Sequence, residues 1–222
     1  MTKKLFWQDP YLTQLNNHIT HVDGNEVTVA ETIFYAFAGG QESDHGTIGG
    51  QRVVQARKEG KEGKEILYTL EEGHGFKVGD AVTMTIDWER RYRLMRLHFA
   101  AELILELAYQ NLRGIEKIGA HISADKARVD FRWAKNISAA IPLLEAAANR
   151  IVQNDAAIVS AYSEEAEERR YWEVAGFARV PCGGTHLKRT GEVGRIQLKR
   201  DNIGKGKERI DVFVLPCRAF LK

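Results

Sequence analysis

Two pairs of side chains, each pair spaced four residues apart, are the part of this sequence best suited to chemistry. His98 and Glu102 lie in the run LMRLHFAAELIL, whose composition favours a helix. Residues four apart on a helix point the same way, so one ion could bind both side chains. A buried histidine beside a solvated carboxylate would give the same pattern. The spacing permits a shared metal ion without requiring one.

The second pair lies in the run VPCGGTHLKR, where Cys182 and His186 are separated by two glycines and a threonine. Such a loop can fold both side chains onto one centre, and thiolate and imidazole are ligands that suit zinc. With His98 and the carboxylate of Glu102 they would complete a tetrahedral set. A cysteine and a histidine could instead be a nucleophile and its base, but the first pair would then have no part. We therefore expect one metal site built from both segments.

The elements that must position these residues divide the chain into two parts. From about Thr28 to Trp88 the sequence contains short β-branched and aromatic runs separated by glycines, which predicts a small β-barrel or curled sheet. At Glu89 the composition changes to helix formers with an apolar stripe, and Gly114 is a suitable C-terminal cap. We expect an N-terminal domain over residues 1–88 and a second domain over residues 89–222.

The second part mixes the two kinds of element. Its runs predict a strand at ARVDFRW, a helix after Ser138, a strand at AAIVSAY and a helix that starts at Ser163 and ends before Gly176. The run GRIQLKRDNIGKGKERIDVFVL predicts a hairpin with a glycine-lysine turn. Elements in this order indicate an α+β fold rather than a regular βαβ wind.

Composition excludes some classes of protein. The 32 basic and 30 acidic residues nearly cancel, so overall charge predicts no partner. No apolar run approaches the roughly 20 residues needed to span a bilayer, so we expect a cytoplasmic protein with no membrane partner. Two cysteines, Cys182 and Cys217, make no disulfide framework, and we expect Cys217 to be a buried thiol and no disulfide-linked partner.

Several short sequence motifs, taken together and in their order along the chain, resemble those of a known protein family. The run CGGTH followed by TGEVG, the run MRLHFAAE and the upstream run AGGQESDHGTI resemble the alanyl-tRNA editing (AlaX) family. These proteins are freestanding relatives of the editing domain of alanyl-tRNA synthetase and, more distantly, of threonyl-tRNA synthetase. The resemblance covers about Thr32 to Val214 and is most specific at residues 182–186. It implies the longer type, with an N-terminal small β-barrel before an α/β editing domain of the threonyl/alanyl-tRNA synthetase second-additional-domain type.

The resemblance also implies an activity and a cofactor. Family members hydrolyse the ester between a wrong amino acid, usually serine and sometimes glycine, and the terminal adenosine of alanine tRNA. One zinc ion per chain would be held by His98, Glu102, Cys182 and His186. The sequence departs from the family at Glu102, where a second histidine is typical, and at Phe99, where a threonine is usual. Glutamate is an acceptable zinc ligand, but Glu102 could serve instead as a general base.

The glycine-rich run AGGQESDHG lines the editing pocket by the same resemblance. Its expected substrate-binding residues are Gly39, Gly40, Gln41 and Asp44, although a polar hairpin turn would look similar. Selecting serine over alanine requires a pocket that hydrogen-bonds the extra hydroxyl. Gln41 and Thr185 are the candidates for that contact and, with Glu102, for catalysis.

Basic residues predict where the tRNA is held. Arg90, Arg91 and Arg93 crowd the start of the long helix, and Lys188 and Arg189 open a segment in which basic residues outnumber acidic ones. Such patches can bind phosphates, although a solvated charged face has the same composition. Because a fold does not determine an activity, a non-catalytic RNA- or amino-acid-binding module remains the rival to a mischarged-tRNA deacylase.

Overall fold

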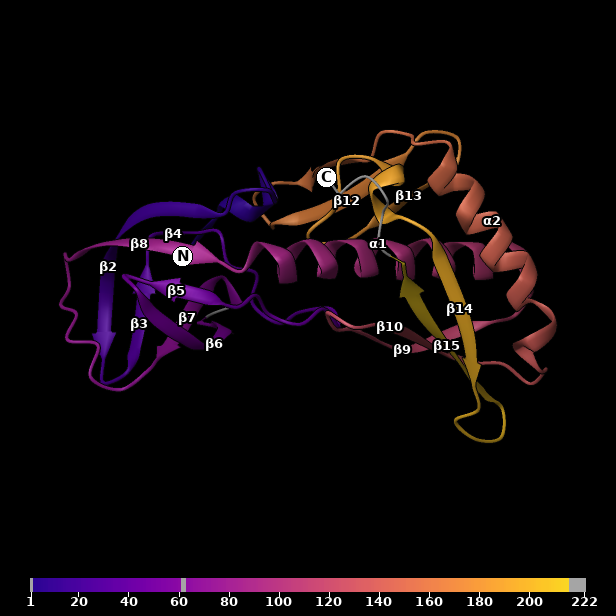
Figure 1. Cartoon of the computed structure of the whole chain (residues 1–222), viewed down its shortest axis with the longest axis horizontal. Helices are drawn as coiled ribbons and strands as arrows, with labels where there is room; N and C mark the ends of the chain where they lie inside the picture. Colours follow the sequence, from indigo (N-terminus) through magenta and orange to yellow (C-terminus); the bar gives the residue numbers. More distant parts are fainter. Residues whose placement is uncertain (1, 61–62, 216–222) are drawn as a thin grey trace. The chain divides into compact units, whose positions relative to one another are not determined.

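The computed structural model describes residues 2–60 and 63–215, and the chain divides into two compact units (Figure 1). Unit 1 comprises Met1–Ala38 and Glu42–Tyr92, and unit 2 comprises Gly39–Gln41 and Arg93–Lys222. The division falls inside helix α1 (Trp88–Asn111) and groups three residues of the glycine-rich run with unit 2. Both units mix strands with helical segments, so the α+β class is confirmed. Cys217 lies outside the described residues.

Six strands of unit 1 pair in an order that closes on itself. Each strand pairs with two neighbours in the order β2 (Gln14–Asp23), β3 (Glu26–Val29), β7 (Glu65–Leu70), β6 (Gln51–Glu59), β5 (Gly46–Ile48) and β8 (Ala81–Ile86), and β8 pairs again with β2. A parallel pair, β1 (Lys3–Lys4) with β4 (Glu31–Thr32), and a short 3-10 helix, η1 (Leu5–Trp7), complete this unit.

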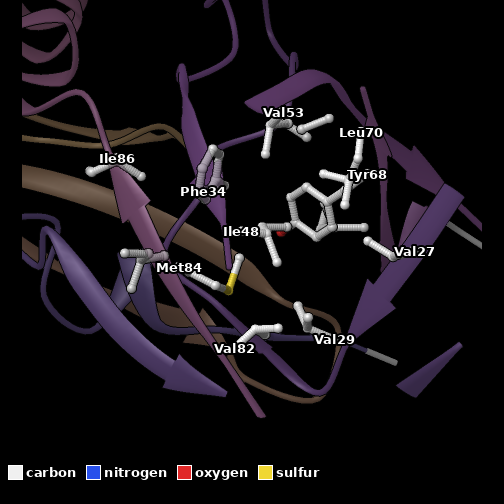
Figure 2. Packing of buried hydrophobic residues seen from close by; sticks show 14 of the residues in the cluster. Val27, Val29, Phe34, Ile48, Val53, Tyr68, Leu70, Val82, Met84 and Ile86 are labelled. Carbon is white, nitrogen blue, oxygen red and sulfur yellow. The ribbon is translucent and has the colours of Figure 1, made fainter. Parts of the chain in front are cut away.

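Alternation along these strands builds the core of unit 1. In β8, Val82, Met84 and Ile86 point inward, as their period-two spacing predicts. Figure 2 shows them with Phe34 and Tyr68 in one apolar cluster. The phenol of Tyr68 pairs with the Thr32 hydroxyl, and burial raises the pKa of Tyr68 well above its usual value. The core therefore holds a polar group whose hydrogen bond is made internally.

Unit 2 contains two antiparallel sheets and most of the helical residues. Four strands pair in the order β14 (Ile196–Asp201), β15 (Lys207–Val214), β10 (Ala127–Arg132) and β9 (Glu116–Ile122). The predicted β14–β15 hairpin is confirmed. A second sheet has the order β11 (Val159–Glu164), β12 (Arg169–Val174) and β13 (Ala178–Pro181). Helix α2 spans Ile141–Gln153, with short 3-10 helices η3 (Ile137–Ala139) and η4 (Thr190–Val193).

The helix expected from Ser163 to Gly176 is wrong. Residues 165–168 form a tight turn in which Glu168 N donates to Glu165 O, and the chain continues into β12. In β12, Arg170, Trp172 and Val174 are buried alternately, which is the period of a strand. The acidic residues after Ser163 suit a helix start, but that local preference is weak beside the burial of alternate side chains.

The predicted apolar stripe of α1 is buried except at Leu105, and residues outside the stripe are buried as well. Leu94, Leu97 and Ala101 belong to the stripe, whereas Met95, Phe99 and Leu103 lie elsewhere around the helix and are buried as well. Polar side chains on this helix therefore enter the interior of unit 2. Among the residues that the structure describes, no helix is long and apolar enough to cross a membrane.

Candidate metal-binding active site

Four side chains in unit 2 converge on one point. One ligand atom from each of His98, Glu102, Cys182 and His186 lies within 4.8 Å of all the others, and no other such group occurs in residues 2–60 and 63–215. His98 Nε2 lies 3.3 Å from both Cys182 Sγ and Glu102 Oε2, and His186 Nε2 lies 3.2 Å from Glu102 Oε2. Nitrogen and oxygen ligands held about 2.0–2.1 Å from a tetrahedral ion lie about 3.3 Å apart. The donor set fits a zinc-like cation.

Two elements and one loop position these atoms. His98 and Glu102 lie one turn apart on α1, as their spacing requires. Cys182 follows β13, and its backbone N–H donates to Arg170 O at 2.9 Å, which extends the β12–β13 pairing by one residue. A Cβ at Gly184 would lie 2.5 Å from His98 Nε2, so the loop can pass the metal-binding residues only where it has no side chain.

The protonation states of the cluster suit a bound cation. Burial opposes ionisation of Glu102, but the imidazoles of His98 and His186 outweigh it and hold the pKa of the carboxyl below its usual value. Burial, followed by the Glu102 carboxylate, raises the pKa of the Cys182 thiol, and burial lowers the pKa of His186. A cysteine nucleophile needs a depressed pKa, whereas a metal ion supplies the positive charge that a buried thiolate requires. This environment disfavours the nucleophile-and-base alternative.

The glycine-rich run reaches the same part of unit 2. Ile122 N donates to Gly40 O at 2.8 Å, and a Cβ at Gly40 would lie 2.5 Å from Ala120 O, so this close approach to β9 requires glycine. Gln41 is completely buried, and its Nε2 donates to Thr185 Oγ1 at 3.0 Å. The fold therefore brings together two expected pocket residues that are 144 positions apart in the sequence. Gly39 lies next to this run with a left-handed φ of 59°.

Asp44 and Arg91 do not occupy the positions that the sequence suggested. Both side chains are completely buried in unit 1, where Arg91 Nε donates to Asp44 Oδ1 at 2.8 Å. Asp44 also accepts from Tyr35 N at 2.6 Å, and Arg91 donates to Pro10 O at 2.9 Å. Arg91 cannot reach an RNA phosphate from this position, and both carboxylate oxygens of Asp44 accept hydrogen bonds from protein donors. Sequence reasoning failed here because a buried arginine and a surface arginine look alike in a basic run.

The other expected tRNA-binding residues differ in exposure. Arg90 is largely covered and donates to Glu42 at 2.7 Å and to Ser43 O at 3.2 Å. Arg93, Lys188 and Arg189 are exposed, although Arg189 also pairs with Asp155 at 2.8 Å. These three side chains thus lie at the surface, unlike those of Arg90 and Arg91.

Arg170 is a charged residue near the site that sequence reasoning missed. It lies opposite Cys182 across the extended β12–β13 pairing, is 7% exposed, and holds its guanidinium 4.4 Å from the ring centroid of Tyr162. Its charge contributes to the lowered pKa of His186, although burial is the larger cause. Because a helix was predicted over this segment, the sequence did not show that Arg170 and Cys182 are neighbours. Cross-strand neighbours can be identified only when the strand pairing is known.

Comparison with known proteins gives the class and then the family. Residues 173–211, which include Cys182 and His186, match the family described as "Threonyl and Alanyl tRNA synthetase second additional domain". The chain is 33% identical to the alanyl-tRNA editing protein AlaX-M of Pyrococcus horikoshii, over 96% of this chain and 98% of that protein. It is 32% identical to AlaX-M of Saccharolobus solfataricus, over 97% and 100% of the respective chains. The chain therefore belongs to the alanyl-tRNA editing (AlaX) family.

Similarity also extends to a larger enzyme. The alanine–tRNA ligase of Methanococcus aeolicus is 31% identical over 95% of this chain, but that match covers only 25% of the ligase. The chain thus corresponds to one segment of the ligase and to nearly the whole of the AlaX-M proteins.

Proposed function

We propose that this protein is a trans-editing hydrolase that deacylates mischarged tRNA(Ala), with Ser-tRNA(Ala) as its main substrate and Gly-tRNA(Ala) as a second one. The observation that carries the proposal is the convergence of His98, Glu102, Cys182 and His186 in a chain that belongs to the AlaX family. Near-complete coverage of proteins named alanyl-tRNA editing protein supports the same activity.

We assign one Zn²⁺ per chain to these four residues. The thiolate, imidazole and carboxylate donors and their separations near 3.3 Å support zinc rather than a hard cation bound by oxygen alone. When bound, such an ion can lower the pKa of a water molecule or hold a polar group of the substrate.

The reaction itself needs little covalent chemistry from the protein. A water oxygen adds to the ester carbonyl carbon while the water loses a proton, and collapse of the adduct expels the ribose oxygen, which takes up a proton. The products are the free amino acid and a tRNA with a free terminal hydroxyl. The chain's own residues must orient the ester, exclude bulk water and accept that proton.

Glu102 is proposed both as a ligand and as the proton acceptor, because its carboxylate is ionised and lies 3.3 Å from His98 Nε2 and 3.2 Å from His186 Nε2. The variants Glu102→His and Glu102→Gln separate the two roles. The histidine variant is expected to keep zinc, and the glutamine variant to lose deacylation by about a hundredfold, the scale of a missing general base. Full activity of the glutamine variant would rule out the base role.

Gly39, Gly40 and Gln41 of the glycine-rich run, with Thr185, are proposed to line the acyl pocket. The contact of Gln41 with Thr185 supports this assignment. Arg93, Lys188 and Arg189 are proposed to contact tRNA phosphates, because they are exposed. We also propose that residues 1–88 form the small β-barrel domain of longer family members, supported by the closed order of strand pairing, and that residues 89–222 form the editing domain.

A direct assay tests the function. Zinc-supplied protein is incubated with seryl-, glycyl- and alanyl-tRNA(Ala), and the aminoacyl group remaining on each is followed over time. We expect loss of serine, slower loss of glycine and retention of alanine. If seryl- and glycyl-tRNA(Ala) both remain intact, the deacylase proposal fails and the non-catalytic binding module takes its place.

A further inference from the structure

Arg170 lies in a row of three side chains that ends at a proposed metal ligand. In the sheet of β11, β12 and β13, Arg170 is paired with Tyr162, and on its other side Cys182 N donates to Arg170 O at 2.9 Å. Residues directly opposite each other on antiparallel strands project from the same face of the sheet. The side chains of Tyr162, Arg170 and Cys182 are therefore neighbours.

This row projects toward helix α1, which carries two of the other proposed ligands. Trp172 is two residues from Arg170 on the same strand, so both side chains project from the same face. The ring centroid of Trp172 lies 5.0 Å from that of Phe99, the residue after His98. Arg170 therefore lies on the face of the sheet that borders the metal-binding residues.

The guanidinium of Arg170 is held in place and enclosed. It lies 4.4 Å from the ring centroid of Tyr162, and Arg170 is 7% exposed. Arg179 stacks in the same way on Tyr171, at 3.7 Å, but this pair projects from the opposite face and the Arg179 side chain is 57% exposed. Burying a charge costs free energy that an exposed charge does not, so a buried arginine needs a reason that an exposed one does not.

The positive charge of Arg170 reaches the metal-binding residues. Burial is the main cause of the lowered pKa of His186, and the charge of Arg170 adds to it. Burial also lowers the pKa of Arg170, an effect that Tyr162 and Cys182 oppose. A guanidinium stays protonated in spite of such a change. Unit 2 therefore holds a permanent cation beside its four proposed ligands.

We propose that Arg170 binds the phosphodiester on the 5′ side of the terminal adenosine and so anchors the nucleotide whose ester is hydrolysed. The inference rests on the proposed function. In an aminoacylated tRNA the α-ammonium is positive and the ester is neutral, whereas this phosphodiester is the permanent anion nearest to the ester. A guanidinium can donate two parallel hydrogen bonds to phosphate oxygens. The phosphodiester is the same for every amino acid, so Arg170 anchors the substrate without selecting the acyl group.

The first test uses two substrates that differ in one charge. Seryl-cytidylyl-adenosine carries the last phosphodiester of the tRNA, and its methylphosphonate analogue has a neutral linkage of nearly the same shape. We expect the wild type to hydrolyse the charged substrate with a kcat/KM about tenfold to a hundredfold higher, the range for hydrogen bonds to a charged group. Arg170→Met should bring this ratio close to one, because the charged substrate loses its anchor.

Two other variants are the controls. Arg179→Met removes the arginine that stacks on Tyr171 on the opposite face, and it should keep the wild-type ratio. Arg170→Lys keeps the charge without the paired donors, so its ratio should lie between those of the wild type and Arg170→Met. If Arg170→Met slows both substrates equally, Arg170 acts on the ester or on the structure of the site, and the proposal is overturned. A wild-type ratio near one would overturn it as well.

A binding measurement separates this inference from the proposed function. Cytidylyl-adenosine and its methylphosphonate analogue, neither of which carries an ester, are titrated into the zinc-loaded protein and followed by NMR. The charged dinucleotide should bind the wild type about tenfold more tightly, and Arg170→Met should bind the two equally. If the wild type deacylates nothing, the proposed function fails while this preference still decides the inference. Equal binding of both dinucleotides by the wild type, or a preference that persists in Arg170→Met, would overturn it.

Discussion

Each unit of the molecule buries a polar cluster, and the two clusters are satisfied to different degrees. In unit 1, Arg91 and Asp44 pair with each other, and backbone groups of Pro10, Ile33 and Tyr35 take up further hydrogen bonds. In unit 2, His98 Nδ1 and Gln41 Oε1 have no partner among the described residues. A buried pair that is fully hydrogen-bonded within the chain has a structural role, whereas buried groups left unpaired indicate a place for a ligand.

The charges of the two clusters show the same difference. Arg91 and Asp44 neutralise each other inside unit 1. In unit 2 the Glu102 carboxylate stays ionised, while burial raises the pKa of Cys182 and lowers the pKa of His186. The unit 2 cluster thus offers a carboxylate, a thiol that can become a thiolate and two imidazoles, which is a donor set that suits a divalent cation.

The largest expected effect comes from removing one partner of the buried Arg91–Asp44 pair in unit 1. Arg91→Met would leave the Asp44 carboxylate buried without its cation, and we expect the free energy of unfolding to fall by about 3–5 kcal/mol. Denaturant titration of the purified variant measures this value. Adding Asp44→Asn should recover part of the loss, because the unpaired charge is then removed. A loss below about 1 kcal/mol would contradict a structural role for the pair.

Changing one of the four proposed zinc ligands in unit 2 should affect activity. Cys182→Ser is expected to reduce zinc bound per chain and to slow deacylation of Ser-tRNA(Ala) by about a hundredfold to a thousandfold, the scale of losing one preorganised catalytic contribution. Elemental analysis and the deacylation assay measure the two effects. If zinc content and rate both stay unchanged, Cys182 is not a ligand and the comparison between the clusters loses its basis.

A pH titration tests a second buried polar pair in unit 1, the phenol of Tyr68 and the hydroxyl of Thr32. The pKa of Tyr68 is raised by burial, so the folded state favours the protonated phenol. Its contribution to stability is complete below about pH 10, the pKa of an exposed tyrosine, and is lost as pH rises above that value. Tyr68→Phe should therefore lose stability less steeply than the wild type above pH 10. Parallel unfolding curves for the two proteins would argue against the contribution of Tyr68.

The smallest effect is expected at an exposed ion pair. Arg189 and Asp155 lie 2.8 Å apart with side chains that are 53% and 51% exposed. Arg189→Ala should change the free energy of unfolding by about 0–1 kcal/mol. If Arg189 also contacts a phosphate, the variant should show a shallower slope of the logarithm of the tRNA binding constant against the logarithm of salt concentration, by about one unit. A loss of stability as large as that of Arg91→Met would remove the distinction between buried and exposed arginines.

Much of the candidate site could be predicted, because its residues carry local signals. His98 and Glu102 lie one helical turn apart, and helix α1 follows from its own composition and apolar spacing. The Cys182–His186 spacing across two glycines indicates a loop that can supply two ligands. The convergence of the pairs could only be proposed, since no local rule joins residue 98 to residue 182.

The errors occurred where long-range contacts outweighed local preference. The segment from Ser163 to Gly176 has residues that suit a helix start, yet it forms the end of β11, a turn and β12, because strand pairing buries Trp172 and Val174. Arg90, Arg91 and Arg93 are neighbours with one chemistry, but only Arg91 is completely buried. Its role depends on Asp44, which lies 47 residues away.

The amino-acid sequence by itself determined the helix that carries His98 and Glu102, the glycine loop that carries Cys182 and His186, and the strand alternation of unit 1. These features depend on spacing, propensity and backbone freedom, which act over a few residues. Only the tertiary structure decided that the four side chains meet, that Arg91 is enclosed, and that Gln41 presents an unpaired oxygen beside Gly184. The physical reason is that burial and hydrogen-bond partners are set by the packing of distant segments.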